Sequence, residues 1–234
     1  MIPKIIHYCW FGKQKKPNDV IQYIETWKRY LPNYIIKEWN ESNYDYKKLR
    51  YTREAYRLKK YAFVSDVCRL YALYNEGGIY FDTDIEVIKP FTKFENYSSF
   101  IGYEVNDLIG TGVIGSMPRS KWIGMILDSY KNEHFIGYNG LMNFYPNTQR
   151  ITDLLTSISD LDKPEIFPLD VFCAMHWKTK EEYVTENTVS IHHYKSSWVS
   201  SPTHKYDVFE QKICNKLKIR NRHLIIRFCK KMIW

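Results

Sequence analysis

The sequence predicts an α/β fold, because short strands and helices alternate along the chain. Residues 5–8 and 34–39 have the apolar or β-rich composition of strands, and a segment with apolar residues at helical spacing lies between them. The chain has 234 residues, of which 44% are hydrophobic, so it can form one domain with a full core.

The elements are expected in a regular order along the chain. Strands are predicted at residues 5–8, 34–39, 79–84, 100–104, 111–115 and 188–191. Helices are predicted at residues 17–31, 45–61, 66–76, 120–130 and 148–158. Open α/β sheets bind their ligands beyond the carboxyl ends of their strands, so functional side chains are expected there.

The helix at residues 66–76 has clear boundary signals. Ser65 is expected to cap its first turn, and Gly77 and Gly78 are expected to end it. Its buried face is expected to contain Val67, Leu70, Tyr71 and Tyr74.

Two aspartates end the strand that follows this helix. Side chains alternate across a strand, so Asp82 and Asp84 are expected to point the same way. Paired carboxylates repel each other unless a cation lies between them, which favours a bound divalent metal and an anionic substrate. Carboxylate ligands favour Mn²⁺ or Mg²⁺ over softer metals. A second triplet of the same form, at residues 160–162, lies in a polar stretch and is interpreted as a solvated loop.

Asp66 and Arg69 lie three residues apart, so their side chains share one face near the start of the predicted helix. They could form an ordinary surface ion pair. They could also form a polar pair beside the end of the acidic strand, able to hold a ribose or a phosphate. The spacing alone leaves both interpretations open.

Three blocks of the sequence resemble a known family. Residues 62–84 hold Asp66-x-x-Arg69, Gly77-Gly78 and Asp82-x-Asp84, residues 2–12 hold Trp10, and residues 191–198 read Ile-His-His-x-x-x-Ser-Trp. In this order they are similar to the DxD-containing sugar-binding glycosyltransferases of the family 32 type. That family includes yeast initiating mannosyltransferases, the lactosylceramide galactosyltransferase, bacterial capsule enzymes and the catalytic domains of large clostridial toxins.

The resemblance implies a GT-A fold, which is a Rossmann-like mixed sheet flanked by helices. It implies that Asp84 binds the metal and that Asp82 holds the ribose and reaches the metal directly or through water. His192 is expected as a third ligand or phosphate contact, with His193 as the alternative, because neighbouring residues of a strand face opposite ways.

The resemblance also assigns roles around the nucleotide. Trp10 is expected to stack on the base, and Trp198 is expected to close over the diphosphate, with core packing as the alternative for both. The expected catalytic residues are Asp82, Asp84, Arg69 and Trp198. The expected donor-binding residues are Trp10, Asp66, Arg69, Asp82, Ser197 and Trp198.

A glycine-rich stretch at residues 110–115 lacks the Gly-Lys-Ser/Thr of a phosphate-binding loop. It is expected to let a strand approach the donor sugar closely. Glu104 and Asp107, just before this stretch, are candidates for the acceptor side.

The net charge of +8 is concentrated near the C-terminus. Residues 205–234 contain nine Lys or Arg and two acidic residues, whereas residues 1–204 contain 25 basic and 24 acidic residues. Apolar residues recur at helical spacing between the basic ones, which predicts basic amphipathic helices. We expect a GT-A domain at residues 1–204 and a tail at 205–234 that lies on an anionic membrane surface. A helix packed against the body is the alternative.

Five widely spread cysteines without a CxxC pair indicate a reducing compartment, and neither a zinc site nor a disulfide framework. The N-terminus lacks a signal-peptide pattern, and no apolar run reaches the roughly 20 residues that span a bilayer. The expected location is therefore cytoplasmic, peripheral on the inner face of the cell membrane.

The paired aspartates predict a metal-dependent enzyme, and the family resemblance implies a retaining hexosyltransferase. Its donor is expected to be a UDP-sugar, and its acceptor a glycan or lipid-linked glycan in bacterial capsule or lipopolysaccharide synthesis. One alternative is a sugar-phosphate nucleotidyltransferase, which would need a glycine- and arginine-rich loop after the first strand, where only Gly12 stands. Another is a nucleic-acid-binding protein, but the near-neutral body gives no extended basic surface, so no nucleic-acid partner is expected.

Overall fold

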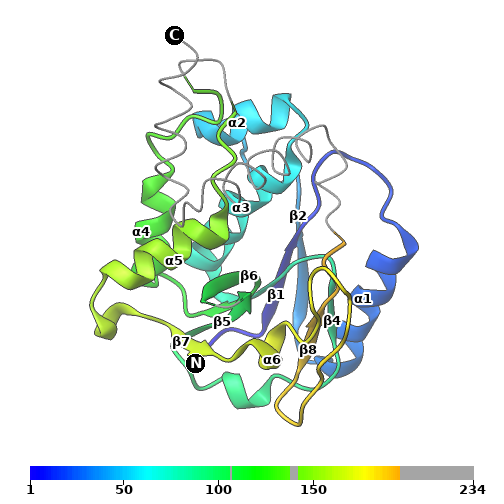
Figure 1. The fold of residues 1–234 in the computed structure, drawn as a ribbon. Helices are drawn as coiled ribbons and strands as arrows, with labels where there is room; N and C mark the ends of the chain where they lie inside the picture. Colours follow the sequence, from blue (N-terminus) through cyan, green and yellow to red (C-terminus); the bar gives the residue numbers. More distant parts are fainter. Residues whose placement is uncertain (106, 138–141, 196–234) are drawn as a thin grey trace, which may run out of the picture. The chain divides into compact units, whose positions relative to one another are not determined.

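The computed structural model describes residues 1–105, 107–137 and 142–195. Residues 1–194 form one compact unit, with a six-stranded mixed sheet at its centre and helices around it (Figure 1). The α/β class and the helix-flanked mixed sheet expected of a GT-A fold are confirmed. The amphipathic helices predicted for residues 205–234 lie outside the described residues.

The large sheet has the order β2-β1-β3-β6-β5-β7, and a second sheet pairs β4 with β8. The strands are β1 (Ile5–Cys9), β2 (Ile35–Trp39), β3 (Gly78–Phe81), β4 (Ile85–Val87), β5 (Ser99–Val105), β6 (Leu108–Ser116), β7 (Glu165–Phe167) and β8 (Ser190–His192). The α-helices are α1 (Asn18–Tyr30), α2 (Arg50–Arg57), α3 (Tyr61–Glu76), α4 (Lys121–Ser129), α5 (Asn147–Ser157) and α6 (Leu169–Phe172). Two short 3₁₀ helices are η1 (Thr92–Phe94) and η2 (Asp160–Asp162).

Strand direction brings three carboxyl ends to one edge of the large sheet. β1 pairs in parallel with both β2 and β3, so these three strands end at the same edge. β6 runs antiparallel to β3 and to β5, which makes the sheet mixed. The residues that follow β1 and β3 therefore lie near each other, at the edge where ligands bind in such folds.

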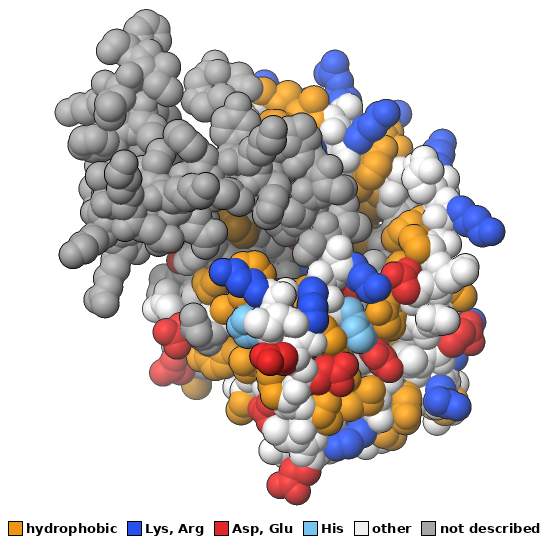
Figure 2. All heavy atoms as spheres, turned by 45° about the vertical axis from the view of Figure 1, so that its right-hand side comes forward, with side chains coloured by type: hydrophobic (Ala, Val, Ile, Leu, Met, Phe, Trp, Pro, Cys, Tyr) orange, Lys and Arg blue, Asp and Glu red, His pale blue; other side chains and the backbone are white. Residues whose placement is uncertain are grey.

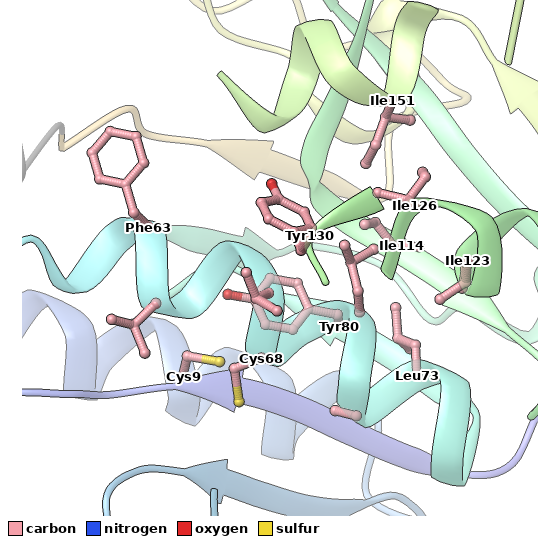
Figure 3. Packing of buried hydrophobic residues seen from close by; sticks show 14 of the residues in the cluster. Cys9, Phe63, Cys68, Leu73, Tyr80, Ile114, Ile123, Ile126, Tyr130 and Ile151 are labelled. Atoms are coloured by element: carbon pink, nitrogen blue, oxygen red, sulfur yellow. The ribbon is translucent and has the colours of Figure 1, made fainter. Parts of the chain in front are cut away.

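Alternating side chains of the sheet fill two cores. On β3, Tyr80 packs with α3 and α4, whereas Ile79 and Phe81 pack with α1, η1 and α6 on the other side. Figure 3 shows the first of these cores, in which Cys68 and Leu73 of α3 face Tyr80, Ile114 of β6 and the strand that carries Cys9. The sheet is thus covered on both faces.

The turn from α3 into β3 depends on two glycines. Gly77 and Gly78 have φ angles of +66° and +103°, which disfavour residues with a side chain. A Cβ atom at Gly78 would lie 2.5 Å from the carbonyl oxygen of Ile5. The imidazole of buried His7 also binds the carbonyl of Gly77, at 2.7 Å. The predicted end of this helix is confirmed.

The predicted start of α3 is wrong. The helix begins at Tyr61, and Ser65 lies inside it, where its hydroxyl donates to the carbonyl of Tyr61 rather than capping the first turn. Phe63 and Val64 are buried, so their packing extends the helix past the predicted cap. Tyr71, assigned to the buried face, is 36% exposed.

Two further expectations need correction. The helix predicted at residues 45–61 is reduced to α2, with turns on either side of it. Residues 160–162 form the short helix η2 rather than an irregular loop, although Asp160 is as exposed as expected.

The surface of the described part mixes both signs of charge. Figure 2 shows Lys and Arg side chains interspersed with Asp and Glu on one face of the molecule. Among the described residues, no helix is long and apolar enough to cross a membrane.

Candidate active site

The two acids of the DxD triplet lie in a turn, not on a strand. β3 ends at Phe81 and β4 begins at Ile85, so the prediction that strand alternation aligns Asp82 and Asp84 is wrong. The backbone N–H of Asp82 donates to the carbonyl of Gly112 on β6, and the N–H of Ile85 donates to the carbonyl of Asp82. These hydrogen bonds close the turn at the sheet edge and present both carboxylates on it.

β8 brings His192 to this turn from more than 100 residues away in the sequence. β4 and β8 are antiparallel, with Ile85 opposite His192, and α1 supports β4 through the indole N–H of Trp27, which donates to the carbonyl of Ile85. The Nε2 atom of His192 lies 3.3 Å from Oδ1 of Asp84. Asp82, Asp84 and His192 each offer one ligand atom, and these three atoms lie within 4.8 Å of one another.

The donor set of this group suits a hard or borderline divalent cation. Two carboxylates and one imidazole are ligands that Mn²⁺ accepts, and carboxylates suit Mg²⁺ as well. Burial lowers the pKa of His192, but the adjacent Asp84 carboxylate and the contact with Cys173 together hold the pKa well above its usual value. The imidazole thus lies in a strongly negative field, which a bound cation would neutralise.

His193 faces away from the group. Its Nε2 atom lies 2.7 Å from Oε2 of Glu86, and its ring stacks on Tyr23 of α1 at a centroid distance of 4.7 Å. Its backbone N–H donates to the carbonyl of Asp84. The structure therefore brings His192, and not the alternative His193, to the two aspartates.

Arg69 is a buried bridge between two acids. Its guanidinium lies 3.0 Å from Asp66 and 3.2 Å from Asp82, and donates to the carbonyl of Thr111 at 2.7 Å. The Arg69 side chain is only 5% exposed, so the interpretation of Asp66 and Arg69 as an ordinary surface pair is wrong. The pair lies beside the end of β3, and it fixes the carboxylate of Asp82.

Asp66 is held in an unusual state. Burial raises the pKa of Asp66 to about 6, and the nearby Asp82 adds to this, while Arg69 acts in the opposite direction. The carboxyl group therefore loses its proton at a higher pH than an exposed aspartate does.

Glu104 and Asp107, the two acceptor-side candidates, have different surroundings. Glu104 of β5 lies beside the group of Asp82, Asp84 and His192, with its Oε1 atom 3.9 Å from Nδ1 of His192. Burial raises the pKa of Glu104, and His192 acts against this. Asp107 is exposed in the turn between β5 and β6.

Trp10 follows the end of β1 at the same sheet edge. Its indole N–H donates to the carbonyl of Gln14, and Lys16 lies 5.9 Å from its ring centre. The ring is partly exposed and borders a hollow of about 360 Å³ that Lys13 and Glu38 also line. Ser197 and Trp198 lie outside the described residues.

Sequence reasoning gave no role to Tyr80 or Cys173. The Tyr80 hydroxyl donates to Oδ1 of Asp82 at 2.8 Å, and Arg69 lies 4.6 Å from its ring centre. A tyrosine two positions before the first aspartate was a usable signal, because such a spacing keeps the two side chains within reach of each other. Cys173 is buried and interacts with His192, but nothing in its local sequence pointed there.

Residues 17–101 match the family described as "Glycosyltransferase sugar-binding region containing DXD motif". This segment holds Asp66, Arg69, Asp82 and Asp84, whereas Trp10 and His192 lie outside it. The match confirms the resemblance on which the expected enzyme class depended.

Comparison with individual proteins gives partial alignments. The chain is 36% identical over 84 residues to glucan organizing enzyme 1 of Cryptococcus neoformans var. grubii serotype A, an alignment that covers 32% of this chain and 23% of that protein. Among solved structures, PaToxG glycosyltransferase has a TM-score of 0.48 at 20% identity and covers 67% of this chain and 69% of its own. A glycosyltransferase involved in the glycosylation of the major capsid of PBCV-1 has a TM-score of 0.49 at 15% identity, over 87% of this chain and 99% of its own.

The acids that converge at the sheet edge are thus the same acids that the family match contains. Residues 17–101 of this chain are similar to the glycosyltransferase sugar-binding regions that contain a DXD motif.

Proposed function

We propose that the chain is a metal-dependent glycosyltransferase that moves a sugar from a UDP-sugar to a glycan or lipid-linked glycan. The observation that carries the proposal is the convergence of Asp82, Asp84 and His192 within 4.8 Å, beside the buried Arg69. A nucleotide-sugar donor has a diphosphate leaving group, and negative charge develops on it as the glycosidic bond breaks. A site that holds a divalent cation meets this requirement.

Asp82, Asp84 and His192 would hold Mn²⁺ or Mg²⁺. When bound, the cation supplies Lewis-acid stabilisation of the departing diphosphate and a template for its orientation. Arg69 and Tyr80 hold the carboxylate of Asp82 from two sides, which keeps its free oxygen positions directed to the site. Such preorganisation lowers the cost of charge development, because these groups do not have to reorient during the reaction.

The nucleotide is proposed to lie between this group and Trp10. The hollow beside the indole ring lies next to the end of β1, the strand adjacent to β3, so a base on Trp10 and a diphosphate at Asp84 would share one edge of the sheet. Asp66 would contact the ribose or the donor sugar. Ser197 and Trp198 are proposed to close over the diphosphate on the strength of the family resemblance alone. The retaining outcome is proposed on the same basis.

The cellular setting is also a proposal. We place the enzyme in bacterial capsule or lipopolysaccharide synthesis, at the cytoplasmic face of the membrane, with residues 205–234 as a basic anchor and no nucleic-acid partner. The uneven charge of the sequence supports this, because basic residues near an anionic surface contribute about 1 kcal/mol each. Deletion of residues 207–234 should release the protein from membrane pellets while donor hydrolysis continues; unchanged sedimentation would reject the anchor.

A screen of nucleotide sugars tests the proposed activity. The protein is incubated with each donor and Mn²⁺, and release of the nucleoside diphosphate is measured with and without a chelator. One UDP-sugar should be cleaved in a Mn²⁺-dependent manner, and NMR of an early product should show the donor's anomeric configuration retained. Absence of turnover with every donor, with and without glycan acceptors, would contradict the proposal.

A further inference from the structure

The side of His192 that faces away from Asp84 carries a feature that metal binding by Asp82 and Asp84 does not explain. Its Nδ1 atom is buried and forms no hydrogen bond of good geometry among the described residues, although the thiol of buried Cys173 also interacts with the imidazole. Glu104 is the nearest carboxylate to this nitrogen, at 3.9 Å. An imidazole buried with one nitrogen poorly paired is costly, so its surroundings indicate what the second nitrogen is for.

Packing fixes the ring between β6 and the end of the described chain. A Cβ atom at Gly112 would lie 3.2 Å from Cε1 of His192, so the glycine makes room for the imidazole. Tyr194 stacks on the ring at a centroid distance of 4.0 Å and an angle of 27°. The ring therefore has little freedom to exchange its two nitrogens.

The carboxylate of Glu104 is placed by the same hairpin. A Cβ atom at Gly110 would lie 2.9 Å from Cβ of Glu104 across the β5–β6 pair, so this glycine also makes room for a functional side chain. The glycine-rich strand was expected to approach the donor sugar closely. In the structure its glycines at 110 and 112 make room for the side chains of Glu104 and His192. Only 17% of the Glu104 side chain is exposed, and it faces the imidazole.

We propose that Glu104 is a positioning residue for the metal ligand His192. It accepts the Nδ1–H of the neutral imidazole, which leaves the Nε2 lone pair directed to a cation between Asp82 and Asp84. Histidine ligands commonly donate their second N–H to a carboxylate, and loss of that partner typically weakens metal binding about 10- to 100-fold. A hydrogen bond needs a distance near 2.7–3.2 Å, so Glu104 must move closer by about 1 Å when the cation binds.

This inference rests on the proposed metal dependence, and the molecule contains a matched control. Glu86 of β4 and His193, which directly follows β8, form a second carboxylate–imidazole pair. Its Nε2 and Oε2 atoms lie 2.7 Å apart. That pair lies outside the group of Asp82, Asp84 and His192. Removing its carboxylate changes a Glu–His contact without changing the proposed support of the metal ligand.

The test measures Mn²⁺ binding to the full chain without donor, by electron paramagnetic resonance titration. Glu104→Ala should weaken binding about 10- to 100-fold, Glu104→Gln should weaken it less because its amide oxygen still accepts a hydrogen bond, and Glu86→Gln should bind as the wild type does. Spin-echo modulation from imidazole nitrogen on the bound Mn²⁺ should be present in the wild type and in Glu104→Gln, and lost or reduced in Glu104→Ala.

Several outcomes would overturn the inference. Wild-type affinity in Glu104→Ala would do so, and so would weakened affinity with the imidazole signal intact, because Glu104 would then act as a charge or a direct ligand. Equal losses in Glu104→Ala and Glu104→Gln would also assign the effect to charge. If Glu104→Ala does not fold, Mn²⁺ affinities of Glu104→Gln and Glu86→Gln are compared. Weaker binding in Glu104→Gln supports the inference, and equal binding in the two variants rejects it. A wild type that binds no Mn²⁺ would reject the proposed metal dependence together with this inference, whereas the other outcomes leave the proposed function standing.

Discussion

The chain contains the triplet Asp-x-Asp twice, and the two copies have different surroundings. At residues 82–84 the side chains are 25% and 15% exposed, and Arg69 and His192 contact them. At residues 160–162 the Asp160 side chain is 94% exposed and pairs with Lys163, while Asp162 pairs with Lys121, which is 68% exposed. The first copy is contacted by the buried side chains of Arg69 and His192, whereas the second pairs with lysines. Asp162 itself is 26% exposed, so the copies differ in their partners rather than in the depth of every carboxylate.

The difference shows what turns a short acidic motif into a site. A surface carboxylate–lysine pair is worth about 0–1 kcal/mol and is easily replaced by water. A carboxylate held by a buried guanidinium and next to an imidazole cannot rearrange, so its unused oxygens remain directed to one point. Variants at residues 160–162 can therefore serve as controls for the same chemical changes at residues 82–84.

The largest expected effect concerns the positively charged side chains that pair with each triplet, Arg69 and Lys121. Arg69→Met removes the buried charge between Asp66 and Asp82 and leaves two partly buried acids without their shared partner, so the free energy of unfolding should fall by about 3 kcal/mol. Lys121→Met removes the surface partner of Asp162 and should cost at most about 1 kcal/mol. Urea unfolding of both variants measures this difference, and equal costs would mean that the Arg69 network is not a structural unit.

The next effect concerns activity. Asp84→Asn removes a proposed metal ligand and should reduce Mn²⁺-dependent donor cleavage by about 100-fold or more, because metal stabilisation of a leaving group is worth several kcal/mol. Asp162→Asn makes the same chemical change in the other triplet and should leave turnover unchanged. Initial rates at saturating donor give the comparison, and full turnover in Asp84→Asn would remove that residue from the metal site.

A smaller effect concerns pH. The fold favours the protonated form of Asp66, because burial raises its pKa from 3.8 to about 6. Its contribution to the free energy of unfolding is therefore fully present below about pH 4 and is lost as the pH rises through 6, at most about 3 kcal/mol for a shift of about two units. Asp66→Asn should abolish this decline in metal-free protein, as measured by urea unfolding from pH 4 to 7. A wild type without the decline would show that Asp66 ionises freely in the folded state.

The smallest effect is expected at Asp160. Its pKa is lowered by Lys163, so the sign is opposite to that of Asp66: its contribution is present at neutral pH and is lost as the pH falls through the lowered pKa. Because the side chain is almost fully exposed, Asp160→Asn should leave the midpoint of thermal unfolding at pH 7 unchanged within error. A clear drop would mean that the second triplet also has a structural role.

The sequence could predict what depends on local pattern. The alternation of strands and helices, the glycine stop at Gly77 and the opposite orientations of the adjacent His192 and His193 all follow from spacings of one to four residues. The buried Asp66–Arg69 pair was left open, because spacing gives the contact and not its depth. The resemblance singled out Asp82, Asp84 and His192, which the structure brings within 4.8 Å of one another.

The remaining features depend on contacts between distant segments. The turn at Asp82 is closed by the carbonyl of Gly112, and the pairing of β4 with β8 joins Ile85 to His192 across more than 100 residues. No local pattern reports such pairings. For the same reason the sequence could not indicate that the β5–β6 hairpin directs Glu104 toward His192.

The most direct test of the central claim is the number of Mn²⁺ ions bound, measured by electron paramagnetic resonance on metal-free protein. The wild type and the double variant Asp160→Asn/Asp162→Asn should each bind one ion, with nitrogen coupling from His192. The double variant Asp82→Asn/Asp84→Asn should bind none at the same concentrations, although it unfolds cooperatively. Wild-type binding in that variant would contradict the account.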